Sequence, residues 1–190
     1  MKQMTRPAAA IAIVLASLAP VSLRAQSPTG EIVHQDSLSV EKKSLRNDIT
    51  SLRDTLDLIA SIHARILRAQ ASGMGAVAIS AGRQLSRACH AGAFGADRDG
   101  RMVASMHTNS PVGDRALKQY HGGLDTLAIN LRVCERDDSA LMAGPSPDRQ
   151  KLAALSAAAV DAIRSYELIR DVLLTTLEIT LPVRGKMFRG

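Results

Sequence analysis

The fold of this 190-residue chain is decided by residues 38–67, LSVEKKSLRNDITSLRDTLDLIASIHARIL. Aliphatic residues recur there at alternating intervals of four and three, and His63 occupies the one step that is not aliphatic. The aliphatic members of this stripe are Leu45, Ile49, Leu52, Leu56, Ile59 and Ile66. Because residues three and four apart share one side of an α-helix, the spacing predicts a helix whose apolar stripe is buried against other helices.

Three later stretches repeat the pattern. Residues 75–90 predict a second helix with small residues on its apolar face, and residues 114–136 predict a third with a leucine-rich stripe interrupted by Gly122-Gly123. The fourth begins at Ser146-Pro147-Asp148, which combines a capping hydroxyl, a proline and an acid, and is expected to run to Leu181, before Pro182. We therefore predict an all-α fold, a bundle of about four helices.

Breaks between these helices are predicted from turn residues. Asp36 or Ser37 can cap the first helix, which places a flexible leader at 26–35 and the bundle domain at 36–182. Two glycines in residues 72–75 are expected to end the first helix. Residues 91–111 hold three glycines and Pro111 and are interpreted as a long, irregular crossover connection with one short helix near 99–107. Residues 139–145 are expected to be a linker and residues 183–190 a basic, flexible tail.

The N-terminal 25 residues have the pattern of a cleaved signal peptide. Lys2 and Arg6 precede an apolar run that is too short to span a bilayer comfortably, and a plausible cleavage region precedes Gln26. We therefore expect a periplasmic or secreted protein without a transmembrane span after cleavage. Removal of this segment lowers the formal net charge from +6 to +3, because the segment carries three cations and no acid.

Composition excludes several classes of function. Tryptophan is absent and only four residues are aromatic, which argues against sites that stack sugar or nucleobase rings. The modest positive charge is interspersed with acids, so nucleic acid is not an expected partner. The wide apolar stripe of the fourth helix can contact two neighbours, or one neighbour and a second copy of the chain, so a homodimer is compatible with the sequence.

Cys89 and Cys134 fall on apolar stripes, each near the expected C-terminal end of a helix. An exported protein with an even number of cysteines most simply forms a disulfide, so we predict one between these two residues. In an up-down bundle the ends of consecutive helices lie apart, so this pairing would require the 91–111 connection to lead the chain back along the bundle. An intersubunit bond and free thiols are the alternatives.

The histidines are the candidate metal ligands, although the spacing does not predict a complete site. Cys89-His90 with Cys134 and His121 offers zinc or copper ligands, but adjacent residues diverge by about 100° on a helix. Met102, Met106 and His107 offer soft copper ligands, although their helical spacing is typical of packing. His63 could ligate haem only with a second axial ligand, and the motif for covalent haem attachment is absent. We therefore expect no bound cofactor.

Residues Ala81-Gly82-Arg83-Gln84, followed by Leu85-Ser86, resemble a short motif of helical nitrate/nitrite-type sensor domains. The resemblance implies a helical sensor domain. It covers about six residues and lacks the further residues that the family has between Gln84 and Leu85, so it assigns no ligand and no family to the chain.

Catalytic motifs are absent from the sequence. It contains no Gly-x-Ser-x-Gly elbow, no His-Glu-x-x-His, no Walker loop and no dinucleotide fingerprint, and the acids, Asp137-Asp138 included, are expected to be solvated. We therefore expect an exported, non-enzymatic bundle protein that acts by protein or small-ligand interaction in a binding, adaptor or sensor-like role. The alternative is a periplasmic metal or haem carrier that uses His63 or the Cys/His residues. The sequence identifies neither ligand nor partner.

Overall fold

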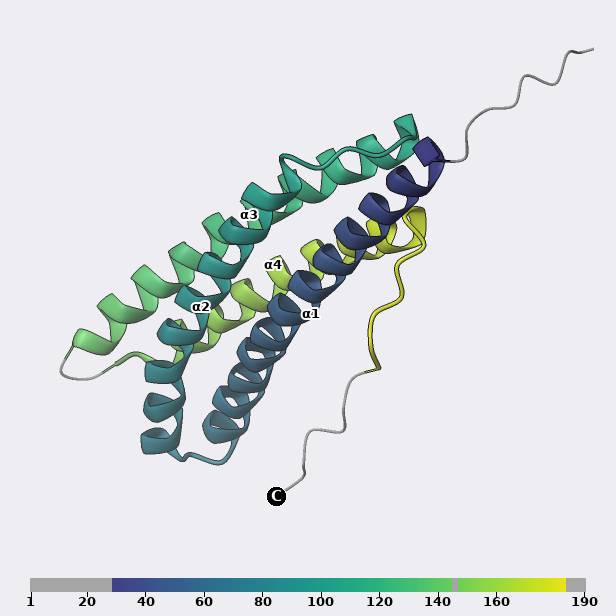
Figure 1. Ribbon diagram of the computed structural model, residues 1–190. Helices are drawn as coiled ribbons and strands as arrows, with labels where there is room; N and C mark the ends of the chain where they lie inside the picture. The colour runs from purple at the N-terminus through teal and green to yellow at the C-terminus, as the bar shows by residue number, and fades with distance from the viewer. Residues whose placement is uncertain (1–28, 145–146, 184–190) are drawn as a thin grey trace, which may run out of the picture.

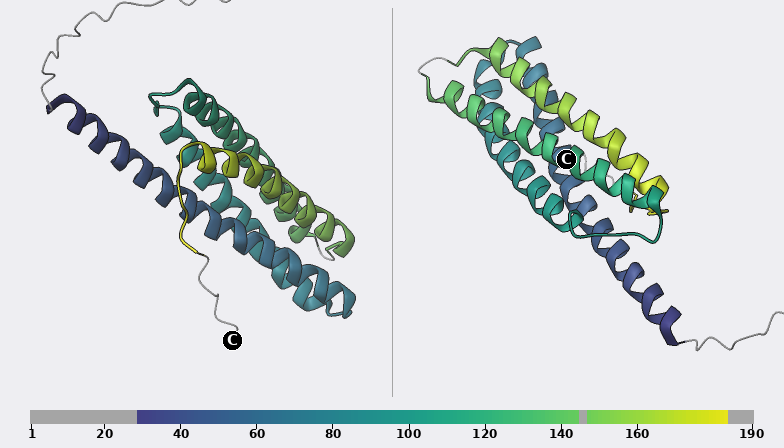
Figure 2. Two further views of the ribbon diagram at one scale, coloured as in Figure 1. Left: turned by 90° about the vertical axis from the view of Figure 1, so that its right-hand side faces the viewer. Right: turned by 90° about the horizontal axis from the view of Figure 1, so that it is seen from above.

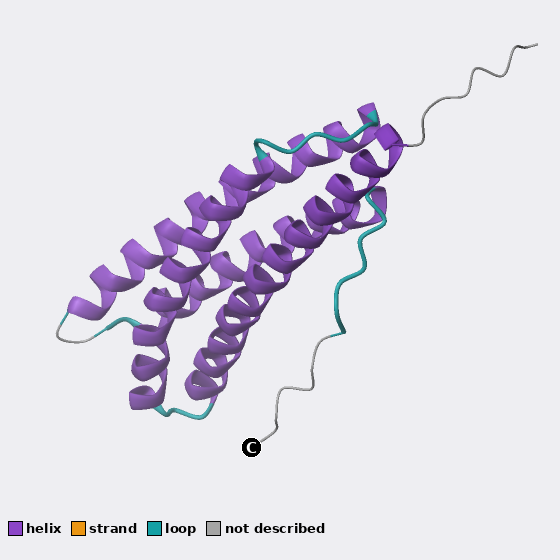
Figure 3. Ribbon diagram, in the orientation of Figure 1, coloured by secondary structure: helices purple, strands orange, loops and turns teal. Residues whose placement is uncertain are grey.

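The computed structural model describes residues 29–144 and 147–183 and shows four helices in an up-down-up-down bundle (Figure 1). The helices are α1 (Thr29–Ala71), α2 (Gly75–Val103), α3 (Pro111–Ala143) and α4 (Arg149–Thr176). Each packs against its neighbour in the chain, and α4 closes the bundle by packing against α1. The predicted all-α bundle is confirmed, and only loops connect the helices in the described residues (Figure 3).

The first helix is longer than expected. It begins at Thr29, so residues 29–35 of the expected flexible leader are helical, and residues 26–28 lie outside the described residues. No proline follows Pro28 until Pro111, so nothing forces a break near the predicted cap at Asp36 or Ser37. The N-terminal part of α1 extends away from the other helices in both views of Figure 2. Its expected stripe is buried from Leu45 onward, but Ile62 takes the buried step that we assigned to His63.

The break after α1 lies where the sequence places it. Gly73 adopts a positive φ of 68°, a conformation that glycine enters without steric cost. The N–H of Met74 donates to the carbonyl oxygen of Ala69 at 2.9 Å, and the N–H of Gly73 donates to that of Gln70 at 3.1 Å. This pattern is a Schellman motif, which satisfies the last carbonyls of the helix. Helices α1 and α2 are therefore separate helices and not one kinked helix.

The prediction of a long irregular connection at 91–111 is wrong. Helix α2 continues through Gly92, Gly95 and Gly100 to Val103, so the expected helix at 99–107 is the end of α2, and only residues 104–110 connect it to α3. These glycines serve packing. A Cβ atom on Gly92 would lie 2.8 Å from Cδ1 of Leu131 and 3.3 Å from Cδ1 of Ile59, and one on Gly95 would lie 3.1 Å from Cδ1 of Leu52. Small residues thus let α2 approach α1 and α3 closely.

Helices α3 and α4 also differ from their expected bounds. Residues 139–143 of the expected linker are helical, because α3 extends to Ala143. The carboxylate of Asp148 caps α4 by accepting from the N–H groups of Gln150 and Lys151 at 2.9 and 3.2 Å, whereas Ser146 lies outside the described residues. Helix α4 ends at Thr176 and not at Leu181, since Glu178 takes a positive φ of 55° and turns the chain. Of the expected tail, only Val183 is described.

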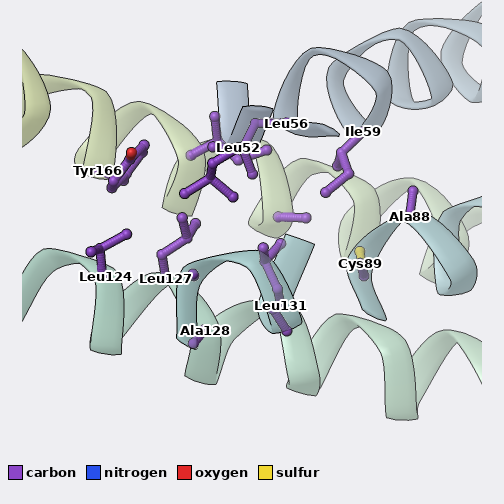
Figure 4. Packing of buried hydrophobic residues seen from close by; sticks show 14 of the residues in the cluster. Leu52, Leu56, Ile59, Ala88, Cys89, Leu124, Leu127, Ala128, Leu131 and Tyr166 are labelled. Atoms are coloured by element: carbon purple, nitrogen blue, oxygen red, sulfur yellow. The ribbon is translucent and has the colours of Figure 1, made fainter. Parts of the chain in front are cut away.

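The core lies along the bundle axis and receives side chains from all four helices. Figure 4 shows Leu52, Leu56 and Ile59 of α1 facing Leu127 and Leu131 of α3, with residues of α2 and α4 on either side. The predicted stripe of α3 is buried in full, from Leu117 to Cys134. Within the described residues, no helix has an apolar stretch long enough to cross a membrane.

Candidate functional site

A groove of about 560 Å³ lies between α3 and α4. Its lining residues come only from these two helices. They are Gln119, Gly122, Gly123, Thr126, Leu127 and Asn130 of α3, with Ala162, Ser165, Tyr166, Leu168, Ile169 and Val172 of α4. The groove therefore follows both helices for about three turns and lies on one face of the bundle.

Two adjacent glycines shape the floor of the groove in different ways. A Cβ atom on Gly123 would lie 3.1 Å from Cδ1 and 3.3 Å from Cγ2 of Ile169, so Gly123 lets α4 pack close to α3. A Cβ atom on Gly122 would have nothing within 4 Å. Glycine in a helix interior costs about 1 kcal/mol relative to alanine. Packing accounts for Gly123 but not for Gly122, which is exposed and lines the groove although alanine would favour the helix.

The groove carries no charged side chain, although Asp, Glu, Lys and Arg make up 22% of the chain. Its polar groups mostly bond within their own helix. The hydroxyl of Thr126 donates to the carbonyl oxygen of Gly122 at 2.9 Å, and the amide of Asn130 donates to that of Thr126 at 2.8 Å. The hydroxyl of Ser165 donates to the carbonyl oxygen of Asp161 at 3.0 Å. The surface offered to an occupant is thus mainly apolar and neutral.

Tyr166 forms part of the groove wall while its hydroxyl group points into the core. The hydroxyl oxygens of Tyr166 and Tyr120 lie 2.9 Å apart, within hydrogen-bond distance, and the two ring centroids are 5.8 Å apart. Burial raises the pKa of both phenols well above the usual value, so both stay neutral at physiological pH. Tyr166 is the only titratable residue among those that line the groove.

The rim of the groove exposes large apolar side chains. Leu168 is 72% exposed and Val172 is 53% exposed, both on α4. Single exposed aliphatic residues are ordinary, but two that line one uncharged groove form a surface suited to an apolar occupant.

His63, His90 and His121 lie at separate places, and each has a partner, whereas His107 and His121 line one hollow at the α2–α3 connection. Nδ1 of His63 lies 2.8 Å from the hydroxyl oxygen of the buried Ser156. Nδ1 of His90 lies 2.9 Å from the carboxylate of Glu135, and Nδ1 of His121 lies 3.1 Å from that of Asp125. Across residues 29–144 and 147–183, no three His, Cys, Asp or Glu side chains are grouped so that they could hold a metal ion.

Cys89 and Cys134 form the predicted disulfide, and both are buried in the core. The expectation that they lie near helix C-termini is wrong, because α2 extends to Val103 and α3 to Ala143, beyond the predicted ends at residues 90 and 136. The two cysteines face each other within antiparallel neighbours, with Cα atoms 6.2 Å apart. The disulfide therefore requires no crossover connection. Its burial indicates a structural role.

Asp138 was expected to be solvated and is instead fully buried. Asp138 is a residue of α3, and its side chain is buried in the bundle. Neither carboxylate oxygen has a hydrogen-bond partner among the described residues. Burial raises the pKa of this carboxyl to about 6, and the nearby backbone N–H of Ser86 opposes the shift without bonding either oxygen. Asp137, its neighbour in the chain, pairs at the surface with Arg136 at 2.8 Å.

Asp99 is a second buried acid, on α2. One oxygen accepts from Nε and Nη2 of Arg98 at 3.0 and 2.9 Å, and the other has no partner in the described part of the chain. Burial raises its pKa, and Arg98 opposes this shift. Asp99 and its neighbours Asp97, Arg98 and Gly100 belong to α2 and not to the irregular connection expected at 91–111.

Sequence reasoning missed the groove, although a signal for it was present. Gly122-Gly123 was read as a weak point of the third helix, whereas the structure shows that one glycine packs and the other faces open space. The positions that line the groove on α3 recur every three or four residues and avoid charge throughout. An uncharged second stripe on a helix that already has a core stripe indicates a further contact surface.

Comparisons of the chain with protein-family models, with curated proteins and with solved structures find no match. The short resemblance at residues 81–86 therefore gains no support. The residues of that segment lie in α2, where Gln84 accepts a hydrogen bond from Arg65 of α1 at 2.8 Å.

Proposed function

We propose that this protein is an exported, non-enzymatic binding protein whose α3–α4 groove takes up a neutral, largely apolar small molecule. The observation that carries the proposal is Gly122, a glycine in a helix interior that packs against nothing and leaves the floor of an uncharged groove open. Glycine at such a position permits close approach of a ligand to the helix backbone.

The lining of the groove favours binding over catalysis. General acid–base chemistry needs a group whose pKa lies near the working pH, and nucleophilic catalysis needs an activated side chain. The groove offers only Tyr166, whose hydroxyl is turned into the core and whose pKa is raised. The remaining polar groups are amides and hydroxyls, which can orient a ligand without reacting with it.

The shape of the groove favours an extended ligand. From Gln119 to Asn130 the helix advances by about 16 Å at 1.5 Å per residue. The volume of about 560 Å³ lies within the usual range for small-molecule sites, roughly 300–1,000 Å³. The amides of Gln119 and Asn130 lie toward the two ends, so a chain-like apolar molecule with a neutral polar end group matches the groove best.

The proposed location rests on the N-terminal signal pattern and on the cysteines. Residues 1–25 lie outside the described residues, so the support is their sequence. A buried disulfide between two helices is typical of proteins that fold in an oxidising compartment such as the periplasm.

The test uses the exported protein and Nile red, a neutral apolar dye whose fluorescence rises in an apolar site. The variant Gly122→Leu places a side chain in the groove and improves helix propensity, so we expect dye binding to fall at least tenfold while thermal stability is kept or raised. Ala140→Leu is the matched control, because Ala140 is an exposed residue of the same helix outside the groove. Equal dye binding by Gly122→Leu and the unaltered protein would exclude the groove as the site.

A metal or haem carrier is the second candidate function. The observation that favours it is a hollow of about 460 Å³ at the α2–α3 connection, lined by Met106, His107 and His121 among others. Soft sulfur and imidazole ligands together suit copper. Native mass spectrometry of the exported protein tests it: a bound metal or haem would support a carrier, and a mass equal to the bare chain would remove this candidate.

A further inference from the structure

A single ridge of exposed side chains runs along the outer side of α2. Its members recur at intervals of three or four and are all exposed: Arg83, Arg87, His90, Phe94, Arg98 and Arg101. Arg83 and Arg101 are eighteen positions apart in the sequence, which is about 27 Å of helix at 1.5 Å per residue. Two arginines precede the phenylalanine and two follow it.

Most of the positive charge on this ridge is not neutralised by the protein. Arg98 pairs with Asp48 at 3.4 Å and with Asp99 at 2.9 Å. In contrast, Arg83, Arg87 and Arg101 have no carboxylate partner within the described residues. An exposed line of unpaired guanidinium groups favours an anionic partner, because no carboxylate of the protein neutralises their positive charge.

The centre of the ridge holds Phe94 and, one turn before it, His90, which pairs with Glu135 at 2.9 Å. Phe94 is 62% exposed, although only four residues of the chain are aromatic. One turn earlier, Ala91 lines a shallow hollow together with Arg87 and Leu58 of α1, and Leu58 is 49% exposed. An aromatic side chain thus stands between the two pairs of arginines, and an aliphatic side chain lies beside Arg87.

We propose that this arginine ridge docks the protein on an anionic bilayer surface, with Phe94 entering the headgroup region. Arginine side chains bind lipid phosphates through paired N–H groups, and an apolar side chain between them adds burial at the acyl boundary. The docking is peripheral, without insertion of a helix into the bilayer. It does not depend on the proposed function, because the ridge is on α2 whereas the groove is lined only by α3 and α4.

The shape of the ridge favours a membrane over an acidic polypeptide. The ridge stands on the outside of α2, and the hollow beside it has a volume of only about 260 Å³. A helical or extended peptide needs a groove, whereas a planar surface can contact a protruding line of side chains along its whole length. A purely electrostatic contact with an acidic polypeptide would not bury the exposed Phe94 at the centre of the ridge.

The experiment is co-sedimentation of the exported protein with vesicles made of equal parts phosphatidylglycerol and phosphatidylcholine, and with vesicles of phosphatidylcholine alone. We expect binding to the anionic vesicles only, weakened by added salt. Replacing Arg83, Arg87 and Arg101 together by glutamine is expected to weaken binding on the order of a hundredfold, since each contributes about 1 kcal/mol near such a surface. Phe94→Ala is expected to weaken binding about tenfold without changing the salt dependence.

The matched control removes the same charge from other faces, by Arg115→Gln, Lys118→Gln and Lys151→Gln in one chain. These residues are exposed on α3 and α4. Circular dichroism confirms that all variants keep their helical content. The proposal is overturned if the unaltered protein does not sediment with anionic vesicles, if the control triple weakens binding as much as the ridge triple, or if soluble polyglutamate binds the ridge and the vesicles do not.

Discussion

The hydroxyl groups of Tyr120 and Tyr166 lie 2.9 Å apart and join α3 to α4 in the middle of the bundle. Both rings are buried, so neither hydroxyl can turn to bulk water. Removing one hydroxyl leaves the other without its partner in an apolar environment, which costs about 1–3 kcal/mol. We expect Tyr120→Phe and Tyr166→Phe each to lower the free energy of unfolding by about that amount, as measured by urea denaturation.

The double variant distinguishes a hydrogen bond from simple loss of two polar groups. Because Tyr120→Phe with Tyr166→Phe leaves no unpaired hydroxyl, the double variant should lose less stability than the sum of the two single variants. Additive losses would show that the two hydroxyls do not stabilise the fold through each other.

Glycines of α2 and α3 are expected to respond to substitution with opposite signs. Gly92→Val places side-chain atoms where Leu131 and Ile59 already lie, so it should destabilise by about 2 kcal/mol through overpacking. Gly122→Ala meets nothing within 4 Å and should stabilise by about 1 kcal/mol through helix propensity. Thermal denaturation of both variants checks this pair, and a loss of stability in Gly122→Ala would contradict our account of the groove floor.

Asp138 should make the protein less stable as pH rises. Its folded-state pKa of about 6 exceeds the ordinary value of 3.8, so the folded protein holds the proton more tightly than the unfolded chain does. The free energy of unfolding therefore falls by up to about 3 kcal/mol as the pH rises from 3.8 to about 6. Above that range Asp138 causes no further change with pH.

Asp138→Asn should remove this contribution to the pH dependence. Urea denaturation of this variant and of the unaltered protein at about pH 3 and about pH 7, on either side of the range from 3.8 to about 6, measures the effect. Asp137→Asn is the matched control, because Asp137 lies at the surface with Arg136. If the two variants show the same pH profile, burial of Asp138 is not the cause.

The disulfide should contribute substantially to stability. It closes a segment with a sequence separation of 45 residues, for which the chain-entropy relation gives about 4 kcal/mol. We expect Cys89→Ala with Cys134→Ala to lower the free energy of unfolding by roughly that amount while the helical content is retained. Unchanged urea denaturation in this double variant would show that the unfolded chain is not constrained by the crosslink.

Local patterns in the sequence determined the class of fold and much of the core. The four-three spacing from Leu45 to Ile66 and from Leu117 to Cys134 was sufficient because one apolar stripe on a helix can only be buried against other helices. The break at Gly73 was readable, and the start of α4 was readable to within a few residues of Ser146, because turn and capping residues act through their own backbone. The pairing of Cys89 with Cys134 followed from parity and compartment.

Only the tertiary structure decided what Gly92, Gly122 and Asp138 do. Helix propensity alone predicts a break at a glycine. Gly92 instead lies within α2, where the close approach of Leu131 leaves no room for a larger side chain. With α2 continuous to Val103, Phe94, Arg98 and Arg101 come into line with Arg83 and Arg87. The groove at Gly122 and the buried carboxyl of Asp138 depend on how two helices approach each other, and that distance is set by side chains far apart in the sequence.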